Sequence, residues 1–224
     1  MLKNRSNYKK LALIVCCLFL PLQLQAKITN YKIDNYYVKD INSNVYFVIR
    51  SFLLNNKSEL LAINIKNFNT NILAANLVTI INPTSNQKID KIFTIDPLKQ
   101  GNNKNDIYLT VDLCQSLKKG FEENFFKELI IYGKTNKKTI NIAISLSRAW
   151  AIKHPKEFTM LKEWDINKDL NITWVNHSYS HFYNSKLPNK KNFMLHDINN
   201  FIPEVINNEI YMLNNGITPS IFFR

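Results

Sequence analysis

Two histidines four residues apart are the strongest chemical signal in the sequence. His177 and His181 enclose Ser-Tyr-Ser and follow directly on an apolar segment at residues 170–175. Residues four apart on a helical turn share one face, so both imidazoles can reach a single metal ion. Neutral imidazole suits zinc and other late transition metals. We therefore expect a divalent metal, zinc first, at this pair, although the same spacing also occurs in solvated loops.

Other residues could complete such a site. Asp112 and Arg224 each follow a short apolar segment. In βα architectures, functional residues gather at the carboxyl ends of strands. Cys114 is either an inert free thiol or the nucleophile of a Cys–His pair. His154 and His196 have no partner at ligand spacing, and we assign them to a helix start and to the surface.

Strand and helix patterns alternate in the second half of the chain. We expect strands at residues 107–111, 140–146, 170–175 and 217–223. We expect helices at residues 121–131, from His154-Pro155 onward, and at 198–213, where Asn214-Asn215-Gly216 is a stop signal. This alternation predicts βα units and a parallel sheet or barrel. If the strands are parallel, the residues with candidate chemistry converge at their carboxyl ends.

Residues 27–104 show no chemical motif. Residues 37–38 and 45–49 have strand character, and residues 52–65 have helical character, which predicts a small α+β extension. A Gly/Asn-rich break at residues 101–105 marks the expected boundary with the second region, at residues 105–224.

The second region resembles a known enzyme family in the order of its motifs. These are Leu109-Thr110-Val111-Asp112, Ile142-Ala143-Ile144-Ser145, Arg148-Ala149-Trp150, His154-Pro155, Asn176-His177-Ser178-Tyr179-Ser180-His181 and Pro219-Ser220-Ile221-Phe222-Phe223-Arg224. Together they resemble the polysaccharide deacetylases of the NodB-homology type, carbohydrate esterase family 4. The Asn-His-Ser-Tyr-Ser-His element is the most specific part of this resemblance.

The resemblance implies a fold, an activity and roles for particular residues. It implies a distorted (β/α) barrel that removes acetyl groups from glycans with a divalent metal. Asp112 matches the general base, His177 and His181 match the metal ligands, and Arg224 matches the arginine that orients the base. The family's second motif aspartate, a metal ligand, is replaced here by Leu113, so the resemblance implies weak metal binding.

The sequence given stops where the family's barrel continues. Arg224 is its last residue, and the family's acid histidine lies beyond the matching position. We therefore expect an incomplete NodB-type barrel, truncated at its carboxyl end, with impaired turnover because loss of an acid–base group costs about 10²- to 10⁴-fold.

The first 26 residues have the order of a secretory signal peptide. A basic leader without acids precedes an apolar run at residues 11–24, and Ala26 offers a cleavage site. This run is short for a membrane span of about 20 residues. We expect cleavage before Lys27, a periplasmic or secreted protein and no lasting span, with an uncleaved anchor as the alternative.

Charge and cysteine content exclude some classes of function. The formal net charge is +12, of which the leader contributes +4 and leaves +8 for the mature chain. Its lysines are scattered and not gathered on one face, which argues against a nucleic-acid partner. Cys114 is the single cysteine outside the leader, so no internal disulfide is expected.

These observations lead to two main hypotheses. One is an exported deacetylase-like enzyme acting on envelope glycan such as peptidoglycan. The other is a non-catalytic glycan-binding protein, or a degenerate gene product, on the same fold. A Cys-dependent hydrolase is a third and more distant alternative. An enzyme of the first kind needs metal and turnover, whereas a binder needs neither.

Overall fold

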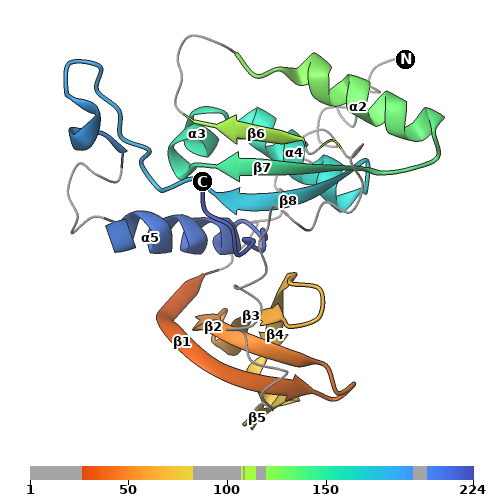
Figure 1. Cartoon of the computed structure of the whole chain (residues 1–224), viewed down its shortest axis with the longest axis vertical. Helices are drawn as coiled ribbons and strands as arrows, with labels where there is room; N and C mark the ends of the chain where they lie inside the picture. The colour runs from red at the N-terminus through yellow and green to blue at the C-terminus, as the bar shows by residue number, and fades with distance from the viewer. Residues whose placement is uncertain (1–26, 83–106, 108, 115–119, 194–200) are drawn as a thin grey trace, which may run out of the picture.

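The computed structural model describes residues 27–82, 107, 109–114, 120–193 and 201–224. Within these residues the protein is a mixed α/β structure with two sheets (Figure 1). A curled antiparallel sheet comes from the first region, and a parallel sheet with its helices comes from the second. The signal peptide, the expected boundary at residues 101–105 and His196 lie outside the described residues.

The antiparallel sheet has five strands in the order β4-β3-β2-β1-β5. Its elements are β1 (Ile28–Asp40), β2 (Val45–Leu54), β3 (Lys57–Asn64), β4 (Thr70–Ala74), the 3-10 turn η1 (Ala75–Leu77) and β5 (Val78–Ile81). Register shifts interrupt the β1–β2 and β2–β3 pairing. Such irregularities increase local twist, which fits the curl of this sheet.

The expected helix at residues 52–65 is wrong. Phe52 lies in β2, which ends at Leu54, and a hairpin turn at Asn55-Asn56 leads into β3. Both asparagines have left-handed backbones, with φ of 51° and 65°. Two successive residues of this kind make the tight turn that matches strand twist, and asparagine tolerates it. Residues 27–82 therefore form β structure with one 3-10 turn, and not the expected α+β extension.

The second region follows the expected alternation. Its elements are β6 (Thr110–Leu113), α2 (Glu123–Thr135), β7 (Ile140–Leu146), α3 (Arg148–Lys153), α4 (Pro155–Ile166), β8 (Leu170–Asn176), the 3-10 turn η4 (Asn189–Lys191) and α5 (Phe201–Asn214). The three strands pair in parallel, in the order β6-β7-β8. The expected elements at residues 121–131, 140–146 and 170–175 and the stop at Gly216 are confirmed; Gly216 has φ of 75°.

The two faces of the parallel sheet differ in chemistry. Leu113, Ile144 and Trp174 lie in one apolar core, to which α2, α3, α4 and α5 all contribute. On the opposite face, where side chains alternate with these, Asp112, Asn171 and Thr173 are exposed. This polar face leads to the carboxyl ends of the strands.

The expected fourth strand at residues 217–223 is wrong as a regular strand. A single parallel bridge joins Phe223 to Asn176. The Ser220 N–H donates to Trp174 O at 2.8 Å, and the Arg224 N–H donates to Asn176 O at 3.1 Å. Pro219 has no N–H to donate, and its carbonyl accepts from the Thr70 hydroxyl instead. The segment therefore runs beside β8 without forming a continuous ladder.

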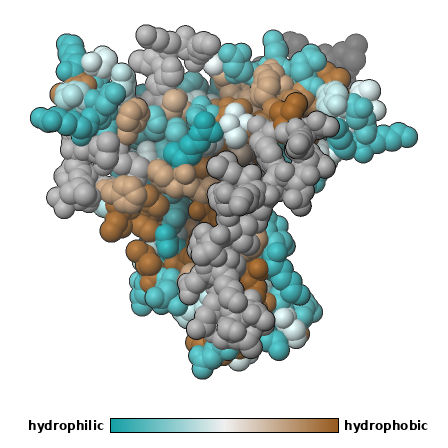
Figure 2. Space-filling model, in the orientation of Figure 1, coloured by the Kyte–Doolittle hydropathy of each residue, from teal (hydrophilic) through white to brown (hydrophobic). Residues whose placement is uncertain are grey.

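Helix α5 joins the two sheets. Leu213 packs with Phe52 and Leu61 of the antiparallel sheet, while its neighbour Met212 lies in the parallel-sheet core. Figure 2 shows apolar surface in the middle of the molecule, at the level of α5. Among the described residues, no helix has the length and apolar character that crossing a bilayer would require.

Candidate metal centre

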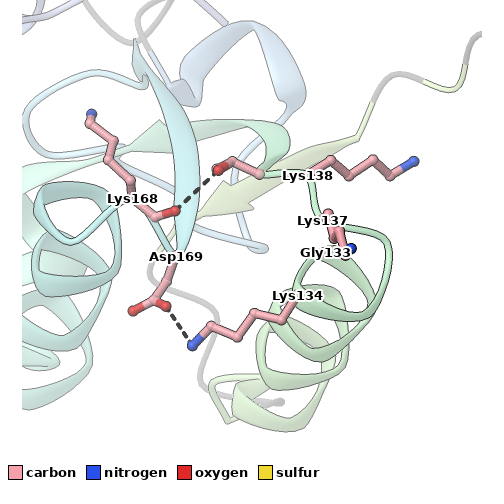
Figure 3. A pocket seen from close by; sticks show the side chains of 7 residues that line it. Gly133, Lys134, Lys137, Lys138, Lys168 and Asp169 are labelled. Atoms are coloured by element: carbon pink, nitrogen blue, oxygen red, sulfur yellow. Dashed lines mark hydrogen bonds and ion pairs between the residues drawn. The ribbon is translucent and has the colours of Figure 1, made fainter.

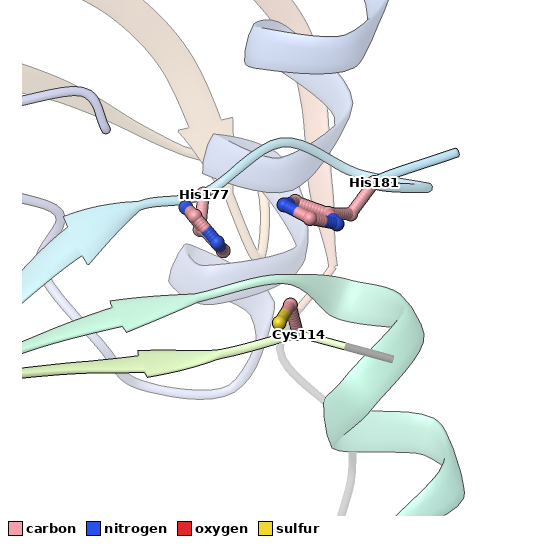
Figure 4. A group of neighbouring side chains, drawn as sticks. All are labelled: Cys114, His177 and His181. Carbon is pink, nitrogen blue, oxygen red and sulfur yellow. The ribbon is translucent and has the colours of Figure 1, made fainter. Parts of the chain in front are cut away.

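The residues with candidate chemistry lie at the carboxyl ends of the parallel strands. Asp112 is in β6, and Cys114 is the first residue after that strand. His177 directly follows β8, and His181 lies in the loop after it (Figure 4). Parallel strands present their carboxyl ends at one edge of a sheet, so segments more than sixty residues apart in sequence meet there.

Cys114, His177 and His181 form a cluster that can hold a metal ion. One ligand atom from each residue lies within 4.8 Å of the other two, and Figure 4 shows the thiol beneath the two rings. The imidazole centroids are 4.4 Å apart. Tetrahedral zinc ligands lie roughly 3.4–3.6 Å from one another, so a contraction of about 1 Å would complete the geometry.

His177 is oriented by the end of the described chain. Its Nδ1 lies 2.6 Å from the carbonyl oxygen of Arg224. A carbonyl oxygen only accepts hydrogen bonds, so Nδ1 carries the donated proton, and Nε2 is the nitrogen that a metal ion could use. Metal-binding histidines are commonly fixed through their second nitrogen in this way. His177 is also 8% exposed, which limits its rotation.

The loop from Ser178 to His181 is not the helical turn that the spacing suggests. Ser178 and His181 have left-handed backbones, with φ of 64° and 46°. Three hydrogen bonds fix the loop: Ser178 N–H to Asn176 Oδ1, His181 N–H to Ser178 Oγ, and Ser180 N–H to Glu204 Oε2 at 2.8 Å. The histidines therefore converge through a tight loop.

The environment of His181 favours its neutral form. Burial, followed by the neighbouring His177, lowers the pKa of His181 below its ordinary value of 6.5. The carboxylates of Asp112 and Glu204 act in the opposite direction but do not cancel this effect. A neutral imidazole is the form that ligates metals, so the lowered pKa keeps a ligand available at neutral pH.

Arg224 reaches Asp112 across the parallel sheet. Its backbone pairs with Asn176 beside β8, yet its Nε lies 3.2 Å from Asp112 Oδ1 on β6. Its Nη1 donates to the Thr110 hydroxyl at 2.9 Å. The side chain thus crosses the sheet near the cluster, and the arginine and aspartate that the sequence singled out are in contact.

Leu113 cannot take part in the site. Its side chain is 6% exposed and lies in the apolar core beneath the sheet. Cys114 is the next residue, and strand alternation returns its side chain to the face of Asp112. The sequence predicted Cys114 as an inert free thiol or as a nucleophile, and not as a metal ligand; its two-residue spacing from Asp112 was the signal that it shares the face of that aspartate.

A buried asparagine pair holds the strand ends and the loop together. Asn208 Nδ2 donates to Leu146 O and to Asn176 Oδ1, and Asn208 Oδ1 accepts from the Arg148 N–H. Asn176 Nδ2 in turn donates to Val205 O. Asn208 and Asn176 are 0% and 2% exposed. They tie β7, β8, α3 and α5 at the point where the loop of His177 begins.

Two hollows lie near the ends of the parallel sheet. A largely apolar cavity of about 460 Å³ adjoins the cluster through Asp112 and Cys114, and Phe121, Phe125 and Trp150 help to line it. The opposite end of the strands has a smaller basic hollow of about 250 Å³ (Figure 3). There Lys134 pairs with Asp169 at 2.7 Å, and Lys134 is 68% exposed, as expected for a solvated surface.

His154 has the structural position that its sequence suggests. It stands between α3 and α4 and stacks on Trp150, with ring centroids 4.9 Å apart.

No model of a known protein family matches the chain, and no solved structure is significantly similar to it.

Proposed function

We propose that this chain is an exported, metal-dependent hydrolase of the polysaccharide deacetylase type, acting on acetyl groups of an envelope glycan such as peptidoglycan. One observation carries the proposal: a Cys114/His177/His181 cluster lies at the same strand edge as an Asp112–Arg224 pair. Such an edge combines metal donors with a carboxylate that can act as a base.

The donor set favours zinc. One thiolate and two imidazoles are zinc ligands, and a site with three protein ligands keeps a fourth position open for water. Bound there, the ion would supply a polarising charge and a water of lowered pKa. Cys114 takes the place of the ligand that the family resemblance puts at Leu113. This proposal makes Cys114 the third ligand beside His177 and His181.

Asp112 is the proposed general base. Its side chain is 35% exposed, so a substrate and water can approach it. The guanidinium of Arg224 lies 3.2 Å from the carboxylate and restricts its rotation. The apolar cavity beside Asp112 and Cys114 offers space for the methyl group of an acetyl substituent.

The sheet order supports the fold part of the proposal. Strands β6, β7 and β8 lie side by side in chain order and in parallel, and residues 220–224 continue in the same direction beside β8. This parallel order is what the first strands of a (β/α) barrel of the NodB type would have, and the proposal assigns that fold to the chain. The export part of the proposal rests on the leader sequence alone.

A non-catalytic role is the second candidate. It is favoured by Leu113, which stands where the family resemblance puts an aspartate ligand. A chain that has lost the family's acidic ligand could retain metal or glycan binding without turnover. Cys114 has its ligand atom within 4.8 Å of those of both histidines, and this proximity also makes a thiol nucleophile an alternative.

Acetate release separates these functions. Purified protein loaded with zinc is incubated with acetylated chitooligosaccharides and peptidoglycan, and the Asp112→Asn and Cys114→Ser variants are run beside it. The proposal expects zinc-dependent acetate release that Asp112→Asn reduces by about 10²-fold or more.

Zinc affinity is measured on the same samples. Cys114→Ser and His177→Ala should weaken binding more than about tenfold, whereas His154→Ala should bind as wild type. Turnover that persists without metal and disappears with Cys114→Ser would identify a thiol hydrolase instead. Metal binding without acetate release would leave the non-catalytic role.

A further inference from the structure

A second site lies away from the metal cluster, in a groove where the two sheets meet. The groove has a volume of about 650 Å³, which is within the usual range for small-ligand sites. One wall is the β3–β4 turn at residues 67–69 with residues 70–71 of β4, and the other is residues 171–174 of β8 with residues 216–222. A hydrogen bond from Thr70 Oγ1 to Pro219 O, at 2.6 Å, holds the walls together. We call this hollow the edge groove.

Amides and hydroxyls dominate the lining of the edge groove. They are Asn67, Asn69, Thr70, Asn71, Asn171, Thr173, Thr218 and Ser220. Amides and hydroxyls both donate and accept hydrogen bonds, as do the hydroxyls of a sugar. Within the described chain, the side chains of Asn69 and Thr173 form no hydrogen bond with another residue, and both are exposed. They line the same groove from its two walls and are available to a ligand.

The edge groove carries no unbalanced charge. Asp165 and Lys168 are its charged lining residues, and their side chains lie 3.9 Å apart. The Asp165 carboxylate also accepts from the Ile172 N–H and, at 2.8 Å, from the Trp174 indole. A groove without a free charge favours a neutral ligand over a phosphate or a charged peptide.

Aromatic side chains complete the lining. Phe222 is 59% exposed, and Phe68 is held at φ of 59° in the β3–β4 turn. A left-handed backbone is uncommon for a bulky residue, and such strain is often retained at binding sites. Aromatic faces pack well against the apolar ring face of a pyranose, while its hydroxyls reach polar neighbours.

We propose that the edge groove binds a neutral oligosaccharide. The Phe222 carbonyl accepts from the N–H of Asn176, one residue before His177, so the groove approaches the metal cluster from the side of β8. The proposal does not depend on the proposed function, because binding in the groove requires neither metal nor turnover.

Calorimetry on the metal-free full chain tests the site, with chitohexaose as the probe and maltohexaose and cellohexaose beside it. We expect saturable binding of at least one of these sugars. Asn69→Ala and Phe222→Ala, on opposite walls, should each weaken it by about fivefold or more. Asn124→Ala, an exposed asparagine on α2, should bind as wild type.

Two results would overturn the site. They are no binding of any of the three sugars at millimolar concentration, and unchanged binding in both Asn69→Ala and Phe222→Ala. Thr173→Val keeps the side-chain shape and removes one hydroxyl. It therefore replaces Phe222→Ala as the test of that wall if Phe222→Ala fails to fold. Because the samples contain no metal, failure here leaves acetate release untouched.

Discussion

At the scale of single residues, side-chain direction decides which of three consecutive residues, 112 to 114, can take part in the chemistry of the candidate site. Asp112 and Cys114 share the polar face at the strand end, while Leu113 between them lies in the core. A one-residue shift along a strand moves a side chain to the opposite face. The chemistry of this site therefore depends on alternation as much as on residue type.

A carboxylate placed at Leu113 should destabilise the protein and not improve metal binding. Leu113→Asp removes a buried apolar side chain and puts an unpaired acid among Ile144 and Leu146. We expect a loss of about 3 kcal/mol or more in the free energy of unfolding, measured by urea denaturation. Leu113→Met, which keeps the volume, should cost less than about 1.5 kcal/mol. Tighter zinc binding by Leu113→Asp would contradict this placement of the side chain.

The lowered pKa of His181 should make stability fall in mild acid. In the folded state this pKa lies below the ordinary value of 6.5. Below pH 6.5 the unfolded chain therefore takes up the proton first, and stability decreases as pH falls toward the folded pKa. The contribution of neutral His181 to the stability of the fold is fully present above pH 6.5.

Thermal melting of metal-free protein between pH 7.5 and 5 measures this effect. His181→Gln should show a smaller drop over that interval than the wild type. An identical drop in both proteins would assign the acid sensitivity to other groups.

At the scale of elements, the buried asparagines fix the ends of β7 and β8. Asn208→Ala would leave the Arg148 N–H and the Leu146 carbonyl without their partner. An unpaired buried polar group costs about 1–3 kcal/mol, so we expect a loss of about 2–3 kcal/mol in unfolding free energy.

The same change should also disturb the Cys114/His177/His181 cluster. Asn176 Oδ1 would keep its bond from Ser178 but lose the one from Asn208, which loosens the start of the histidine loop. Asn207→Ala, an exposed neighbour on α5, is the matched control and should change neither stability nor zinc affinity. Equal effects of the two substitutions would show that the network has no special role.

At the scale of the whole molecule, α5 couples the two sheets. Glu209 on α5 forms an ion pair with Arg50 of β2 at 2.9 Å and accepts the Tyr31 hydroxyl at 2.8 Å. The side chains of Arg50 and Glu209 are 16% and 12% exposed. Burial and the Glu209 carboxylate raise the pKa of Tyr31 above its ordinary value, so this hydroxyl stays protonated as the donor.

Neutralising Glu209 should weaken the junction between the sheets. Glu209→Gln leaves the Arg50 charge mostly buried without a counter-ion, and we expect a loss of about 2–4 kcal/mol in unfolding free energy. Chemical denaturation measures it. Adding Arg50→Met removes the stranded charge and should recover part of the loss. A double variant no more stable than Glu209→Gln would show that the ion pair does not couple the sheets.

The sequence by itself determined the βα order of the second region. Apolar periods of two and of 3.6 residues, with Pro155 opening a helix and Gly216 following one, mark elements that form from local interactions. The sequence also singled out Asp112, His177, His181 and Arg224, because their types and their positions after apolar segments carry chemical meaning without coordinates.

Only the tertiary structure decided how these residues meet. It replaced an expected helix by a hairpin, since the left-handed Asn55-Asn56 turn is selected by the pairing of β2 with β3. It brought Cys114 to the histidines and put Leu113 in the core, because strand ends far apart in sequence come together only through the register of β6, β7 and β8. Such long-range pairing leaves no local signal in composition or period, and this is why the third member of the cluster appeared only in the folded chain.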